Sequence, residues 1–102
     1  MGSISYEGGL RMNGIRVGDL VRVKVGVKDP DFDIDIGGWQ GRVLYETAGL
    51  PCILWDSITL AQMPKQVFDR SEEENLDWRS MYLEPDDVYV IVRADALGEY
   101  PY

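Results

Sequence analysis

The strongest pattern in this sequence is an alternation of apolar and polar residues over positions 20–27. Valines occupy positions 21, 23, 25 and 27, and Arg22, Lys24 and Gly26 stand between them. A period of two residues is typical of a β-strand that buries one face. Further strand-like runs cover residues 31–36, 42–46, 52–56 and 88–92. The last run is apolar throughout, as expected for a strand covered on both faces. The sequence therefore predicts a mainly β fold.

Turn signals between these runs predict how the strands pair. Asp29 and Pro30 follow the first run, and both residue types favour turns. Residues 31–36 are therefore expected to fold back on residues 20–27. The aspartates would then stabilise the pairing across the two strands. The expected facing positions are Asp31 with Lys28, Asp33 with Gly26, and Asp35 with Lys24. Residues 42–46 and 52–56 flank a short loop and predict a hairpin.

The length of 102 residues leaves room for one domain of ordinary size. We expect this domain over residues 17–93, with a loose, glycine-rich arm at 1–16 and a tail at 94–102. Residues 59–83 predict one or two short helices that Trp55 and Trp78 pin to the β core. The helix signals are the capping-box spacing of Thr59 and Gln62, Pro64 at a helix start, and a second capping box over residues 71–74.

Composition argues against several functional classes. The chain has no histidine and a single cysteine, Cys52, which rules out structural zinc and nucleophiles activated by histidine. The aspartates at 29–35 fail the EF-hand pattern, because its glycine and glutamate positions hold other residues. We therefore expect no enzyme, no catalytic set, no metal and no cofactor. The N-terminus lacks a signal sequence and no apolar run approaches the ~20 residues of a membrane span, so the expected location is the cytoplasm.

Three segments carry a resemblance to a known fold. They are Val17-Gly18-Asp19-Leu20-Val21-Arg22-Val23, then Gly38-Trp39-Gln40-Gly41-Arg42-Val43, then Ile53-Leu54-Trp55-Asp56. With a long acidic loop between the first two, they resemble the KOW and Tudor-like branch of SH3-like barrels. This resemblance implies a small barrel with a helical insertion at about 59–83 before the last strand, and the branch includes peptide-binding, RNA-associated and structural members. The sequence also resembles a family of small bacterial and plant proteins of unknown function.

The leading functional hypothesis is a non-enzymatic interaction module that binds a protein partner through an acidic loop and aromatic side chains. Trp39 lies in a glycine-rich segment with no obvious strand register to bury it. It therefore either anchors a partner or covers the open end of a barrel. Cross-strand pairing with the two lysines would instead give the aspartates a structural role. The predicted partner-binding residues are Asp31, Asp33, Asp35, Trp39 and Tyr45.

Two alternatives stay open at this point. A basic strand face could contact the phosphates of RNA or of a ribosome, although the net charge of −8 opposes binding to polyanions. The residues predicted for that role are Arg16, Arg22, Lys24 and Arg42. Alternatively, residues 88–92 and the aromatic tail could be buried in a homodimer, which would make the chain a self-associating structural domain.

Overall fold

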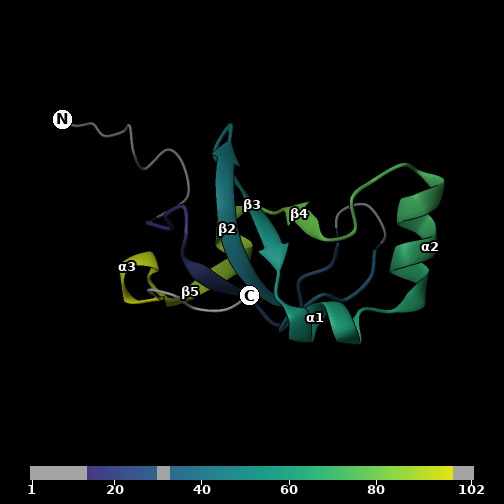
Figure 1. Cartoon of the computed structure of the whole chain (residues 1–102), viewed down its shortest axis with the longest axis horizontal. Coiled ribbons are helices and arrows are strands. Elements are labelled where there is room, and N and C mark those ends of the chain that lie inside the picture. The colour runs from purple at the N-terminus through teal and green to yellow at the C-terminus, as the bar shows by residue number, and fades with distance from the viewer. Residues whose placement is uncertain (1–13, 30–32, 98–102) are drawn as a thin grey trace.

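Five antiparallel strands form a sheet in the computed structural model, which describes residues 14–29 and 33–97 (Figure 1). In chain order the strands are β1 (Leu20–Val23), β2 (Gln40–Thr47), β3 (Leu50–Trp55), β4 (Ser80–Tyr82) and β5 (Val88–Val92). Their order across the sheet is β4-β3-β2-β1-β5, so β4 and β5 are the two edges of a sheet that is not closed. The prediction of a mainly β fold is confirmed.

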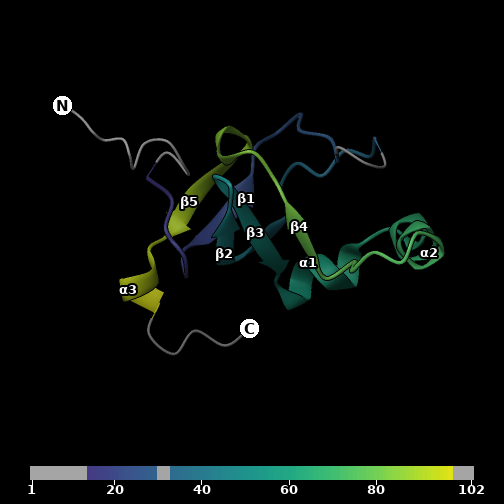
Figure 2. The same cartoon turned by 90° about the horizontal axis from the view of Figure 1, so that it is seen from above.

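Short helices lie at the two ends of the sheet (Figures 1 and 2). Helices α1 (Ser57–Gln62) and α2 (Lys65–Glu73) follow β3, the 3-10 turn η1 (Pro85–Asp87) leads into β5, and α3 (Ala94–Leu97) follows β5. Helix α2 stands out beyond β4 at the right of Figure 1, and α3 lies at the opposite end. The predicted helices between the hairpin and the last strand are present. The same stretch also contains strand β4, which the sequence analysis missed.

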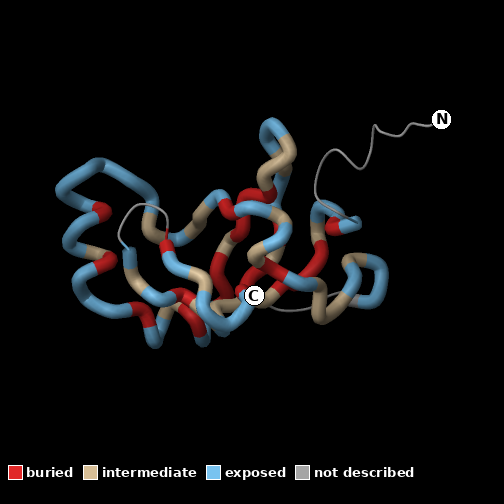
Figure 3. The backbone as a smooth tube through the Cα atoms, turned by 180° about the vertical axis from the view of Figure 1, so that it is seen from behind, coloured by how far each residue is buried: buried red, intermediate tan, exposed pale blue. Residues whose placement is uncertain are grey.

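The hairpin of β2 and β3 forms the centre of the core and confirms the predicted pairing. Val43 lies opposite Ile53, and Gly41 lies opposite Trp55; all four residues are buried. Glycine is needed at position 41, because a Cβ atom there would collide with the backbone of Leu54. Figure 3 shows the buried positions gathered along the central strands, whereas helix α2 is buried at isolated points only.

Strand β1 is shorter than its alternating sequence predicts. It ends at Val23, and the chain turns at Val25 and Gly26, where Gly26 has a φ of 91°. Val25 is 96% exposed, so the alternation does not continue as a strand over residues 20–27. The strand ends in a turn, in which the N–H of Val27 donates to the carbonyl of Lys24 at 3.4 Å, and the N–H of Gly38 donates to the carbonyl of Val23 at 2.8 Å where the chain returns.

The acidic loop between β1 and β2 folds back in a different register from the expected one. Lys28 forms an isolated bridge with Asp35, and the N–H of Ile36 donates to the carbonyl of Val27. Asp35 therefore faces Lys28 and not Lys24. The N–H of Asp29 donates to the carbonyl of Ile34 at 2.8 Å, which closes a tight loop at the tip. Asp31 lies outside the described residues.

The helices begin at other residues than the capping-box spacing predicts. Asp56 caps α1, because its side chain accepts a hydrogen bond from the N–H of Thr59 at 2.8 Å. Pro64 is the N-cap of α2, as its position predicts. The second capping box is wrong: Ser71 is buried within α2, and Glu74 is the residue that ends this helix. A buried serine inside a helix and a capping serine have the same local sequence, so spacing alone does not separate them.

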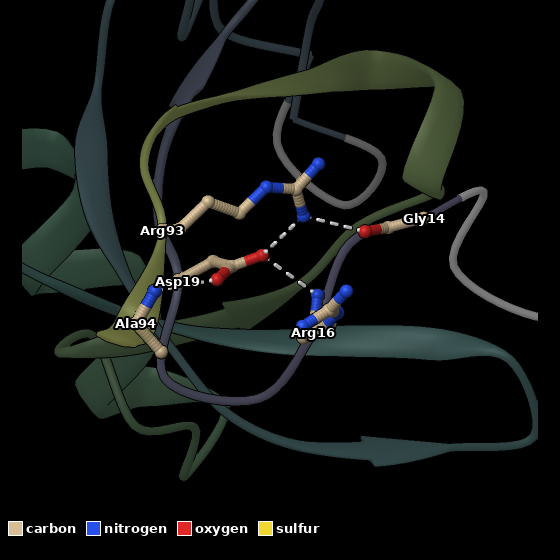
Figure 4. Close-up of polar contacts among 5 residues, drawn as sticks. All are labelled: Gly14, Arg16, Asp19, Arg93 and Ala94. Atoms are coloured by element: carbon tan, nitrogen blue, oxygen red, sulfur yellow. Dashed lines mark hydrogen bonds and ion pairs between the residues drawn. The ribbon is translucent and has the colours of Figure 1, made fainter. Parts of the chain in front are cut away.

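A buried carboxylate ties the two ends of the described chain together (Figure 4). Asp19 is fully buried, and it accepts hydrogen bonds from the N–H of Arg16 at 2.8 Å and the N–H of Ala94 at 2.8 Å. The guanidinium of Arg93 donates to Asp19 at 3.0 Å and to the carbonyl of Gly14 at 2.7 Å. Residues 14–18 and the start of α3 are therefore held on opposite sides of one charged group.

Strand β5 differs from the expectation of a strand covered on both faces. Val88 is buried in the core, but Tyr89 is 42% exposed. The reason is position: β5 pairs with β1 on one side only and forms an edge of the sheet.

Candidate functional site

A groove of about 350 Å³ lies along edge strand β4. All three residues of β4 line it, together with helix α2 and Asp29 of the β1–β2 loop. A second hollow shares Ser71, Asp77 and Trp78 with it and continues around the C-terminal end of α2 to Glu72. The full lining of the first groove is Asp29, Val67, Ser71, Leu76, Asp77, Trp78, Ser80, Met81 and Tyr82.

Helix α2 forms the outer wall of the groove through its buried side. Val67 and Ser71 are four residues apart, so they share one face of the helix and line the groove together. The segment after the helix is held back against it by aromatic packing. The rings of Phe68 and Trp78 meet edge to face, with their centroids 4.8 Å apart. This contact places Trp78 in the groove wall and fixes the distance between α2 and β4.

Asp77 supplies a carboxylate at the end of the groove. Its Oδ1 accepts hydrogen bonds from the backbone N–H of Arg79 at 3.0 Å and from the Arg79 Nε at 3.1 Å. The backbone bond is the main cause that holds the pKa of Asp77 below its ordinary value of 3.8. The Arg79 guanidinium also lies over the ring of Trp78, 5.6 Å from its centroid. Asp77 is therefore charged at neutral pH and held in a defined orientation.

Asp29 contributes a second acidic residue from the opposite wall. It is 3% exposed, and its backbone is used within its own loop. Its N–H donates to Ile34, and its carbonyl accepts from the N–H of Asp33. Asp29 is therefore a buried residue of the groove lining.

Two tyrosines mark the mouth of the groove. Tyr82 lines it, and the hydroxyl groups of Tyr82 and Tyr45 lie 2.8 Å apart with their rings edge to face. Both side chains are exposed, at 41% and 46%. The bond to Tyr82, followed by a bond to Cys52, raises the pKa of Tyr45 above its ordinary value. The Tyr45 phenol is therefore neutral at physiological pH, and its hydroxyl is bonded to that of Tyr82.

The structure places the predicted partner-binding residues in different settings. Tyr45 contacts the groove through Tyr82. Asp33 and Asp35 are exposed on the loop that carries Asp29, and Asp35 accepts a bond from the N–H of Gly37 at 2.9 Å. Trp39 is half-buried and packs edge to face on Trp55, with centroids 5.3 Å apart. Of the two roles considered for Trp39, its position fits that of a cover over the core.

The basic residues considered for RNA binding are spread over the sheet. Arg22 donates two hydrogen bonds to the side-chain oxygen of Gln40, at 3.2 and 2.6 Å. Arg42 is half-buried, and its Nε and Nη2 atoms are out of solvent. Arg16 and Lys24 are exposed but lie beyond opposite ends of β1. These four side chains therefore do not present a row of free cations.

Several groove residues had no signal in the sequence. Strand β4 spans three residues, which is too short for a period-two pattern to be read. Val67 and Ser71 have the spacing of one helix face, but a serine at that position does not suggest burial. The Asp29 turn was predicted as a turn, whereas Trp78, predicted within a helix, lies in the turn between α2 and β4.

The groove offers carboxylates, hydroxyls and apolar surface. Within residues 14–29 and 33–97, no group of three or more Asp, Glu, Cys or His side chains is placed to hold a metal ion. In the same part of the chain, no helix has the length and apolar character needed to cross a membrane. Comparison with protein-family models, curated proteins and solved structures gives no match for this chain.

Proposed function

We propose that the chain is a non-enzymatic protein-interaction module, and that the groove beside β4 binds a positively charged segment of a protein partner. The observation that carries this proposal is the combination of aromatic, apolar and carboxylate side chains in one groove at an open sheet edge. Interaction hot spots are rich in aromatic residues that sit in pockets and exclude water from a few polar contacts.

Charge favours a basic partner. The chain carries a net charge of −8, and the groove contains Asp29 and Asp77, with Glu72 in the adjoining hollow. Both bonds from Arg79 go to Oδ1 of Asp77, so Oδ2 is the atom offered to a lysine or arginine of the partner. Opposite charges at an interface mainly raise the rate of association and the specificity.

The size of the groove supports a peptide segment over a large cofactor. A volume of about 350 Å³ is at the low end of the range of about 300–1,000 Å³ that ligand sites occupy. Such a space accommodates a few side chains. Val67, Leu76 and Met81 provide apolar contact, and Trp78 provides a rigid aromatic wall.

We also propose that the open sheet belongs to the SH3-like class that the sequence resembles. The support is the order of the elements: a strand, a long acidic loop, a hairpin, a helical insertion and a last strand that returns to pair with the first. The SH3-like proposal concerns architecture only, and binding at the groove does not depend on it.

The proposal is tested with a short capped peptide that alternates valine and lysine, and with the same peptide carrying glutamate in place of lysine. NMR titration of the full chain is expected to show binding of the lysine peptide only, with shifts at Trp78 and Met81. Asp77→Asn should weaken binding about threefold, in line with roughly 0.2–1 kcal/mol for an exposed charge pair. Asp95→Asn on α3 is the matched control and should leave affinity unchanged. Equal binding of both peptides, or shifts confined to other surfaces, contradicts the proposal.

A further inference from the structure

The hydrogen-bonding pattern of β4 shows which of its backbone groups face the groove. The N–H of Trp55 donates to the carbonyl of Arg79 at 3.0 Å, and the N–H of Leu83 donates to the carbonyl of Pro51 at 3.3 Å. In an antiparallel pair, residues alternate between pointing their backbone groups toward the neighbouring strand and away from it. Residues 79, 81 and 83 therefore bond to β3, and Ser80 and Tyr82 point their N–H and carbonyl groups to the other side.

That other side is the groove. Ser80 and Tyr82 both line it, opposite α2 and the Asp29 loop. Among the described residues, no backbone group bonds to Ser80 or Tyr82 on this side. The backbone of Asp29, the nearest candidate in the lining, is bonded to Ile34 and Asp33 within its own loop. An edge with a row of unpaired backbone groups is a template for one more strand.

We infer that the partner's segment binds as an extended strand that pairs with β4 and adds a sixth strand to the sheet. This inference rests on the proposed function and specifies how the groove is used. Main-chain bonds to Ser80 and Tyr82 would provide affinity, and alternate side chains would provide specificity. Side chains on a strand repeat on each face every second residue, about 7 Å apart. The segment that fits alternates apolar residues, which meet Val67 and Met81, with basic residues, which meet the carboxylates.

The opposite edge of the sheet has a less acidic lining. The hollow beside β5 is lined by Lys24, Arg93 and Asp86, and the Arg93 guanidinium is paired with Asp19. The groove at β4 is lined by Asp29 and Asp77. The charges of the lining therefore favour a basic segment at β4 over one at β5.

The test uses N-methylated versions of the valine–lysine peptide, so that the protein itself is unchanged. One version carries methyl groups on the valine amides and the other on the lysine amides. When the peptide pairs antiparallel to β4, as β3 does, only one set of amides can face β4 while the valines meet the apolar wall. We expect one isomer to lose at least about tenfold in affinity, the equivalent of about 1.4 kcal/mol, and the other to bind within about twofold of the parent. Equal affinities of the two isomers, whether high or low, overturn the inference.

Hydrogen exchange provides an independent measurement. At saturation with the parent peptide, the amides of Ser80 and Tyr82 should exchange at least about tenfold more slowly, because they become hydrogen-bonded. The amide of Met81, already bonded to β3, should change less and serves as the internal control. Unchanged exchange at Ser80 and Tyr82 in the bound state overturns strand pairing alone. Failure of the parent peptide to bind would instead overturn the proposed function.

Discussion

Replacing Asp19 with asparagine tests how the ends of this domain are held. The carboxylate accepts three hydrogen bonds, from the N–H groups of Arg16 and Ala94 and from the Arg93 guanidinium. Asparagine has nearly the same shape but keeps only one side-chain acceptor. Its amide nitrogen is a donor, and it would face N–H groups that now donate to the carboxylate. Oδ2 accepts from Arg16 and Arg93, and Oδ1 accepts from Ala94, so an amide oxygen in the place of Oδ2 keeps two bonds and loses one.

The expected loss of stability follows from the burial of this group. A hydrogen bond to a charged group contributes about 1.5–3 kcal/mol. The lower figure applies here, because the Arg93 side chain is 48% exposed and its attraction is screened by solvent. One lost bond gives a decrease of about 1.5 kcal/mol in the free energy of unfolding. With a urea m value of about 1.5 kcal/mol/M, the midpoint should fall by about 1 M.

Urea unfolding followed by circular dichroism measures this shift, and Asp33→Asn is the matched control. Asp33 is exposed and has a φ of 58°, a conformation that asparagine tolerates as well as aspartate. The control should therefore move the midpoint by less than about 0.3 M, since exposed substitutions usually change stability by less than about 0.5 kcal/mol. A shift of the same small size for Asp19→Asn would refute the reasoning that this carboxylate clamps the chain ends.

Gly41→Ala should lower the free energy of unfolding by about 3 kcal/mol, because the added methyl group meets the β3 backbone. At Gly38 there is open space for a methyl group but φ is 89°, so Gly38→Ala should lower the free energy of unfolding by about 1 kcal/mol in the same urea assay. Tyr82→Phe should lower the pKa of Tyr45. That pKa is measured from the tyrosinate absorbance of each protein after subtraction of the absorbance of the same protein carrying Tyr45→Phe. Because that pKa is raised, stability from the tyrosine pair is complete below pH 10 and lost at higher pH. Because the pKa of Asp77 is lowered, its contribution to peptide affinity should persist above pH 3.8 and be lost as the pH falls further. If the pH dependence of the peptide affinity is the same in Asp77→Asn, this prediction is wrong.

The parts of the fold that sequence reasoning predicts are those that local pattern determines. The β2–β3 hairpin joins two strands through a two-residue turn, in which Ala48 and Gly49 have φ values of 53° and 84°. The apolar run of β5 also marks a strand directly. In both cases, the side-chain pattern and the backbone geometry are set by neighbours in the chain.

The parts that sequence reasoning misses are set by distant contacts. Val25 continues the alternation of β1, but the chain turns over residues 24–27 and returns beside Val23, where Gly38 bonds to it. Trp39 looks like an exposed anchor within its own segment, yet Trp55 from β3 gives it an aromatic surface to cover. Strand β4 forms because it pairs with β3, and three residues are too few to show a strand pattern in the sequence. The groove was missed for the same reason, since β4 is its floor.

The helical insertion explains why a small sheet can have one edge available for binding. An exposed edge strand invites aggregation, and proteins usually blunt such edges with charge, with proline or with a covering segment. At β5, Lys24, Arg93 and Asp86 supply charged side chains beside the edge. At β4, helix α2 stands beside the edge and the Phe68–Trp78 contact sets its distance, so the edge faces a narrow groove in place of open solvent. A single extended segment with positive charge is the ligand that we propose for this space. The same helix would therefore cover the edge strand and limit what can pair with it.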